Sequence, residues 1–143
     1  MAGRNYQDPI VGTMAAGETC ANQGLLLKAD GSGNLATCDA VTDTPVGVAA
    51  QESQRDADGV LLAAGRVSFY PSGGVIFCHS VGSEALVTGA LLYTSQTADA
   101  DGSVSTDSSN SAVVVGVYVG EALTTSTNTA GLLIPVNTNR AVW

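Results

Sequence analysis

Hydrophobic and polar positions alternate in short runs along most of the chain, and turn-forming residues separate these runs at regular intervals. Alternation of this kind is typical of β-strands with one buried face. The turns carry Asp-Gly, Gly-Gly or Thr-Asn pairs, which tolerate tight backbone geometry. Strands are expected at residues 25–28, 35–38, 46–49, 66–70, 75–79, 91–94, 113–119 and 132–136. This spacing predicts an all-β protein, a compact β-barrel or β-sandwich.

Helical signals are confined to two segments. Residues 83–87 can form one turn with Ser83 as its cap, and residues 53–62 are ambiguous. The fold is therefore expected to contain at most one or two short helical turns.

The two halves of the chain repeat one pattern. Residues 17–27 align with residues 82–92 at a constant offset of 65, and residues 46–49 correspond to 115–118 after a small insertion. Two copies are too few for a solenoid, so we expect two related halves that share one core. Chance similarity between segments rich in Gly and Val is the alternative. The residues expected to be buried are Leu26, Leu35, Val46, Val48, Leu91, Val104, Val115 and Val117.

The repeat divides the chain into three parts. An extended N-terminal arm spans residues 1–14, a single β domain spans 15–137 with half-repeats at about 16–50 and 82–136, and a C-terminal tail spans 138–143. Arg4, Tyr6, Arg140 and Trp143 lie in the arm and the tail, where the domain's own core can least use them. Because such residues are favoured at interface centres, we expect them to contact a partner chain. Ordinary frayed termini are the alternative.

Charge narrows the range of partners. The chain of 143 residues has 13 Asp and Glu against 5 Lys and Arg, a formal net charge of -8. This charge repels a phosphate backbone, so no nucleic-acid partner is expected. No apolar run approaches the roughly 20 residues of a membrane span, and the first residues lack the apolar stretch of a signal peptide. We therefore expect a soluble protein made in the cytoplasm, with no membrane partner.

Candidate catalytic groups are few. His79 is the only histidine and follows Cys78 at the end of a predicted strand, where we expect it to be satisfied by backbone or water. The cysteines, Cys20, Cys38 and Cys78, are odd in number, so free buried thiols are expected rather than a disulfide framework. Nucleophile motifs and phosphate-binding loops are absent from the sequence. We predict no catalytic residue, no cofactor and no enzyme activity.

Paired aspartates are the remaining candidates for a metal site. Asp99, Asp101 and Gly102 begin like a calcium-binding loop, but Val104 and Asn110 stand where that loop needs Gly and Glu. The turn-forming role of Asp-Gly explains these residues, and no metal ligand is predicted. A weak surface cation at residues 56 and 58 or 99 and 101 is the alternative.

Several short segments resemble a known family by their order and spacing. They lie at residues 82–93, 101–105, 114–118 and 131–136, with similar first-half segments at 16–18, 24–27, 30–31 and 45–49. In this respect the chain, from about residue 10 to 137, resembles the small β-rich capsid decoration, or cement, proteins of tailed double-stranded DNA viruses.

The resemblance implies a structural virion protein of a bacteriophage or archaeal virus. Such a protein is made in the host cytoplasm, binds the outer surface of the assembled capsid and stabilises it without catalysis. Its partners would be the major capsid protein and further copies of itself, with a homotrimer favoured. A non-viral β-module for ligand binding or surface-lattice assembly is the alternative.

Overall fold

The computed structural model describes residues 8–96 and 99–140, and this part of the chain is all-β. Ten short strands form two antiparallel sheets of five strands each, neither closed into a barrel, so the predicted all-β class is confirmed in its sandwich-like form. A single 3-10 turn, η1 (Thr138–Arg140), follows the last strand. The described residues contain no helix that is long and apolar enough to cross a membrane.

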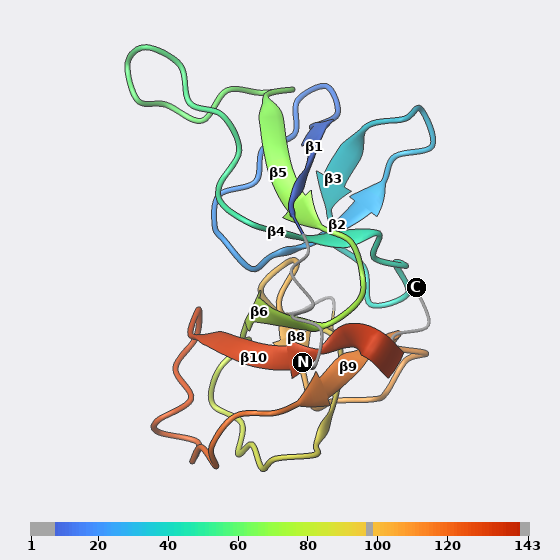
Figure 1. Cartoon of the computed structure of the whole chain (residues 1–143), viewed down its shortest axis with the longest axis vertical. Helices are drawn as coiled ribbons and strands as arrows, with labels where there is room; N and C mark the ends of the chain where they lie inside the picture. The colour runs from blue at the N-terminus through green and yellow to red at the C-terminus, as the bar shows by residue number, and fades with distance from the viewer. Residues whose placement is uncertain (1–7, 97–98, 141–143) are drawn as a thin grey trace, which may run out of the picture.

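Each half of the chain builds one sheet (Figure 1). The strand order is β1-β5-β4-β2-β3 in the first sheet and β6-β10-β9-β7-β8 in the second. The two orders are identical once each strand of the first half is replaced by its counterpart. In sequence order, the strands are β1 (Ile10–Thr13), β2 (Leu26–Ala29), β3 (Leu35–Thr37), β4 (Gly47–Ala49), β5 (Arg66–Tyr70), β6 (Val75–His79), β7 (Leu91–Thr94), β8 (Val104–Ser105), β9 (Val114–Tyr118) and β10 (Leu133–Asn137).

The hydrogen-bonding register repeats together with the strand order. Leu26 lies opposite Val48 between β2 and β4, and Leu91 lies opposite Val117 between β7 and β9. Isolated parallel bridges join Met14 to Leu35 in the first half and Ser80 to Val104 in the second. The internal repeat read from the sequence therefore corresponds to two copies of one sheet.

Two strands lie outside the predicted set. β1 falls within the segment expected to be an extended arm, and it pairs only with β5 at the edge of the first sheet. β8 has two residues, too few to show a period. The helical turn suggested for residues 83–87 is not formed. Instead Leu86 pairs with Leu123 through two backbone hydrogen bonds of 2.9 and 2.8 Å, and Ser83 has a positive φ of 58°.

The buried side chains form two clusters. One belongs to the first half and contains Met14, Cys20, Leu25, Leu27, Leu35, Ala49 and Val67. The other combines the inner side chains of the second half with three from the first half, Leu26, Cys38 and Val48. The first sheet is thus buried on both faces around β2 and β4.

Burial follows the expected pattern in the first half more closely than in the second. Leu26, Leu35, Val48, Val104 and Val115 are buried, as predicted. The prediction was wrong for three residues: Val46 and Leu91 are exposed and Val117 is only half-buried. Leu91 and Val117 lie on the face of the second sheet opposite its core, because side chains alternate between the two faces of a strand.

Candidate functional site

The predicted contact residues lie at the limits of the structure. Arg4, Tyr6 and Trp143 are outside the described residues, and of Arg140 only the backbone is described, in η1. Their contact role stays a prediction.

The first residues of the C-terminal tail are hydrogen-bonded to the turn between the two halves. The Thr138 hydroxyl accepts a hydrogen bond from Gly73 N at 2.7 Å and donates one to Gly74 O at 3.0 Å. Gly74 N donates to the Asn139 side-chain oxygen at 2.7 Å. The start of the tail is therefore held at a defined place on the molecule.

Cys78 and His79 do not form a reactive pair. They are neighbours in β6, so their side chains point to opposite faces of the strand. Cys78 is fully buried, and burial raises the pKa of its thiol to about 12. His79 is half-buried, which lowers its pKa, and its Nδ1 lies 2.9 Å from the Ser103 hydroxyl. A buried thiol with a raised pKa is a poor nucleophile.

The other two cysteines are also free and buried, as predicted. Burial raises the pKa of both thiols, to about 12 for Cys38. Cys20 lies beside Ser53, whose backbone N–H donates to Cys20 O at 2.8 Å. These thiols act as small apolar side chains in the core.

The paired aspartates at 56 and 58 lie in a turn that the Asp56 carboxylate stabilises through hydrogen bonds. Asp56 Oδ1 accepts hydrogen bonds from the backbone N–H groups of Asp58 and Val60, at 2.9 and 3.0 Å. Asp30 makes the same pattern with Ser32 and Asn34. Among the residues that the structure describes, no three His, Cys, Asp or Glu side chains are grouped to hold a metal ion.

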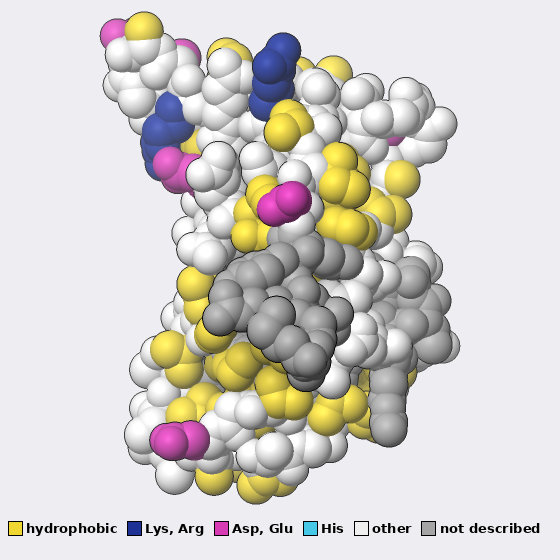
Figure 2. Space-filling model, in the orientation of Figure 1, with side chains coloured by type: hydrophobic (Ala, Val, Ile, Leu, Met, Phe, Trp, Pro, Cys, Tyr) yellow, Lys and Arg dark blue, Asp and Glu magenta, His cyan; other side chains and the backbone are white. Residues whose placement is uncertain are grey.

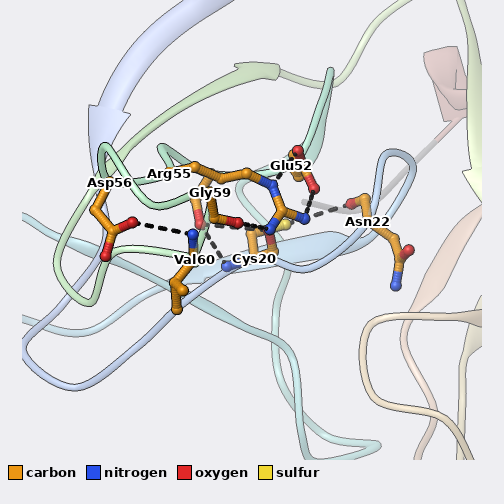
Figure 3. Close-up of polar contacts among 8 residues, drawn as sticks. Cys20, Asn22, Glu52, Arg55, Asp56, Gly59 and Val60 are labelled. Carbon is orange, nitrogen blue, oxygen red and sulfur yellow. Dashed lines mark hydrogen bonds and ion pairs between the residues drawn. The ribbon is translucent and has the colours of Figure 1, made fainter.

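Polar contacts of Arg55 and Asp56 order a hairpin at residues 52–62 (Figure 3). Arg55 binds both carboxylate oxygens of Glu52, through Nε and Nη2, at 2.7 Å each. Its Nη1 donates to Gly59 O at 2.6 Å. The bond from Arg55 lowers the pKa of Glu52. The hairpin thus holds an apolar side chain, Val60, that is 59% exposed.

The basic side chains of this acidic chain differ in whether they form ion pairs. Lys28 is paired with both Asp39 and Asp43, and the hydrogen bonds to them raise its pKa. Arg66, at the start of β5, is exposed and forms no ion pair within the described part of the chain. On the face shown in Figure 2, the Lys and Arg side chains gather at the end formed by the first sheet.

Two hollows differ in charge. One, of about 530 Å³, lies beside the hairpin and is lined by residues 51–55 and 66–68 together with Val11, so that Arg55 and Arg66 both border it. The other, of about 480 Å³, lies between the halves and is bordered by Glu18, Asp39, Asp101 and His79. The molecule therefore offers a hollow with two arginines at one end and an acidic hollow near its middle.

The second sheet presents an apolar outer face, which sequence reasoning missed. We define this outer face by six apolar side chains on one side of β6, β7, β9 and β10, a side that also carries His79 and Asn137: Val75, Phe77, Leu91, Val117, Leu133 and Pro135. Val75 is 55% exposed, Phe77 53% and Leu91 47%. The four strands contain no Asp, Glu, Lys or Arg, and this lack of charge was the signal available in the sequence.

Comparison with solved structures shows a likeness in fold. No protein-family model and no curated protein sequence matches this chain. The structure is similar to a chain of the solved structure "The capsid of Myoviridae Phage XM1", with a TM-score of 0.59 and 14% sequence identity. The likeness covers 97% of this chain and 88% of that chain. The two chains thus share a fold along nearly their whole lengths.

Proposed function

We propose that this protein is a capsid decoration protein, which binds the outer surface of an assembled tailed-virus capsid and stabilises it without catalysis. The likeness to a chain of a myophage capsid structure over 97% of this chain carries the proposal. The sequence resemblance to capsid cement proteins points to the same role independently. In this proposal the protein is a structural component of the virion, located on the capsid exterior.

The state of the reactive side chains is consistent with a structural role. The Cys78 thiol is buried with a raised pKa, and Asp56 is used by its own turn. These groups support the fold, as do the Arg55 contacts that order the hairpin.

Binding only to the assembled shell explains how so small a protein stabilises a capsid. A ligand that binds one state and not the other stabilises the bound state by mass action. Many copies on one shell multiply a modest interface. The net charge of -8 also disfavours adhesion to nucleic acid released from other particles.

The proposed contacts with the major capsid protein are Arg4, Tyr6, Arg140 and Trp143. The hydrogen bonds that hold Thr138 at the start of the C-terminal tail support a contact at this terminus. The ordered hairpin at residues 52–62, with its exposed Val60, supports a second contact there. A trimer is the oligomer that we propose on the capsid.

The test is binding to capsids assembled from the major capsid protein of the same virus. We expect saturable co-sedimentation with assembled capsids, no binding to unassembled subunits, and a higher capsid melting temperature with the protein bound. Bovine serum albumin at equal concentration controls for trapping in the pellet. Failure to bind assembled capsids refutes the proposal, and binding of a glycan instead favours the non-viral β-module.

A further inference from the structure

The two outermost strands of each sheet approach each other at one equivalent point. An isolated parallel bridge joins Ser80 to Val104 in the second sheet and Met14 to Leu35 in the first. In both sheets the residue after Ser80 or Met14 donates a backbone hydrogen bond across the bridge, at 3.0 and 2.7 Å respectively. The backbone groups around the two bridges can therefore be compared residue by residue.

In the second sheet, a short segment of the first half binds beside this bridge. His79 N donates a hydrogen bond to Gly24 O at 2.9 Å, and Leu26 N donates one to Gly102 O at 2.8 Å. Residues 24–26 are buried in this position. We call the His79 N–H and the Gly102 C=O the second edge site. The chain itself thus shows which backbone groups of this fold receive another peptide segment.

The equivalent groups of the first sheet are the Thr13 N–H and the Gly33 C=O, which we call the first edge site. Thr13 N points away from β5, because Met14 N donates to Gly65 O and the direction of these groups alternates along an antiparallel pair. Among the residues that the structure describes, none is hydrogen-bonded to either group of the first edge site. Thr13 and Gly33 are both exposed. Unpaired backbone groups at the edge of a sheet are a template for pairing with another chain.

Packing at the two glycines shows that one edge site is filled and the other is open. A Cβ atom on Gly102 would lie 3.1 Å from Cβ of Leu25, the middle residue of the bound segment. A Cβ atom on Gly33 would meet nothing within 4 Å, although its φ of 89° is close to the 74° of Gly102. The backbone of the first edge site is thus formed, and the described residues leave space beside it.

One difference between the two edge sites indicates which kind of segment the first one accepts. Leu133 lies opposite His79, and Arg66 lies opposite Thr13. Leu133 packs against the bound segment, since a Cβ atom on Gly24 would lie 2.6 Å from Leu133 Cδ2. A segment at the first edge site would instead lie beside Arg66, which is exposed and forms no ion pair within the described part of the chain. A guanidinium forms its strongest hydrogen bonds with anionic groups, and the anionic group that a peptide segment supplies is a carboxylate.

We propose that the first edge site binds an acidic peptide segment of another protein. The Thr13 N–H and the Gly33 C=O bind the backbone of the segment, as in strand-addition complexes, and Arg66 binds one of its carboxylates. The residue in the place of Gly24 is a glycine, because a Cβ atom on Gly24 would lie 2.9 Å from the backbone nitrogen of His79 in the edge strand. Arg66 also borders the hollow of about 530 Å³ beside the hairpin, which gives room to the flanking side chains of the segment.

Charge favours this occupant over a second copy of the chain. The segment of the second half that is equivalent to residues 24–26 is 89–91, and the two residues before it, Val87 and Thr88, are uncharged. A second copy would therefore leave Arg66 without a carboxylate, and its net charge of -8 would add repulsion. The inference does not depend on the capsid role, because it concerns only the chemistry of the segment.

The experiment follows the backbone amide signals of the full isotope-labelled chain by NMR during titration with a synthetic peptide. The peptide has the sequence of residues 20–27 with Cys20→Ser and Gln23→Asp, so that a carboxylate directly precedes its glycine. We expect saturable shifts of the amides of Thr13 and Asn34, which belong to the two peptide groups of the first edge site. A control peptide with Gln23→Lys should bind at least tenfold more weakly, although the net charge of the protein attracts it.

Three variants of the protein locate the binding. Arg66→Glu should reverse the preference, so that the peptide with Lys binds at least tenfold more tightly than the peptide with Asp. Thr13→Pro removes the N–H of the first edge site and should weaken binding at least tenfold. Val11→Pro is the matched control, since Val11 N also points away from β5 but its counterpart, Phe77 N, makes no hydrogen bond to residues 24–26 among the described contacts. This control should bind the peptide as the unmodified protein does.

Melting temperatures verify that the variants are folded, and proline is tolerated on an edge strand where its nitrogen faces outward. Arg66→Glu keeps the test decisive if Thr13→Pro fails to fold. An unshifted Thr13 amide, or equal affinity for the two peptides, overturns the inference. A Thr13 amide that shifts with protein concentration alone shows that a second copy occupies the site, which also overturns it.

The capsid-binding assay separates this result from the proposed function. A protein that binds capsids and ignores the peptide contradicts the inference and leaves the decoration role standing. A protein that binds the peptide and ignores capsids has the opposite meaning.

Discussion

Gly24 and Gly89 occupy equivalent positions in the two halves, and only Gly24 is packed against the other half. Each donates a backbone hydrogen bond of 2.8 Å to its counterpart acceptor, Ala49 O for Gly24 and Tyr118 O for Gly89, and the φ angles are 85° and 95°. A Cβ atom on Gly24 would lie 2.6 Å from Leu133 Cδ2, whereas a Cβ on Gly89 would meet nothing within 4 Å. Substitutions at these two glycines therefore distinguish the cost of a side chain at positive φ, which both share, from the cost of crowding between the halves, which only Gly24 has.

Replacing each glycine by alanine is the first prediction. Both variants place a side chain at a positive φ, which costs about 1 to 2 kcal/mol. Gly24→Ala also forces Leu133 and the β6 backbone to move, and overpacking of this kind costs roughly 1 to 3 kcal/mol more. Urea unfolding should rank Gly24→Ala as the less stable variant. Equal losses would contradict the tight packing between the halves.

Arg55→Ala is expected to loosen the hairpin without unfolding the sheets. The guanidinium binds Glu52 and Gly59 O, while the hairpin itself is exposed. Hydrogen exchange should become faster at the backbone amides of Gly59 and Val60. Arg66→Ala, which alters an exposed arginine of the neighbouring strand β5, should leave these exchange rates unchanged.

Stability is expected to depend on pH through His79. Burial lowers its pKa from 6.5, so just below pH 6.5 the unfolded chain binds more protons than the folded chain. The contribution of His79 to the free energy of unfolding should therefore be at its full value above pH 6.5. It should decrease as the pH falls below 6.5. His79→Gln should flatten the slope between pH 5 and 7. The lowered carboxyl pKa of Asp107 acts below 3.8, outside this range.

The three cysteines are expected to be inert in the folded protein. All are buried, and burial raises their pKa values. A thiol reagent at pH 8 should label none of them within minutes and all three after unfolding in urea. Rapid labelling of the native protein would show that part of the core opens readily.

Removing the ends of the chain is expected to weaken capsid binding more than stability. Deletion of residues 1–7 removes Arg4 and Tyr6 but leaves β1 (Ile10–Thr13) in the first sheet. This variant and Trp143→Ala should lose capsid affinity in co-sedimentation while keeping the melting temperature. If both variants bind capsids as well as the unmodified protein does, the contact surface must instead lie on the hairpin at residues 52–62 or on the loop at residues 96–110.

Local sequence is sufficient to define several strands. The residue limits of β5, β6 and β7 agree with the prediction, because turn residues bound them closely, such as Gly65, Pro71 and Gly74. β1 was not predicted because its four residues, Ile-Val-Gly-Thr, show no alternation of apolar and polar positions, and their side chains are exposed or only half-buried in the fold.

The local sequence could not predict which of two equivalent residues is buried. Leu26 and Leu91 lie in nearly identical segments, Gly-Leu-Leu-Leu and Gly-Ala-Leu-Leu, and differ only in what the rest of the molecule places against them. The hairpin contacts of Arg55 were missed for the same reason, since Gly59 O reaches the guanidinium only once the loop has closed. The contact role of Arg4, Tyr6, Arg140 and Trp143 stays a prediction.

The division of the two sheets along the chain also sets a sequence of events during synthesis. All five strands of the first sheet lie within residues 10–70, so they can pair before the second half has been translated. Until then Leu26 and Val48 have no cover, because their cover is made of residues that do not yet exist. At about 5 to 20 residues per second the ribosome leaves this surface open for several seconds. Nascent chains released near residue 75 should therefore be the species most prone to aggregate.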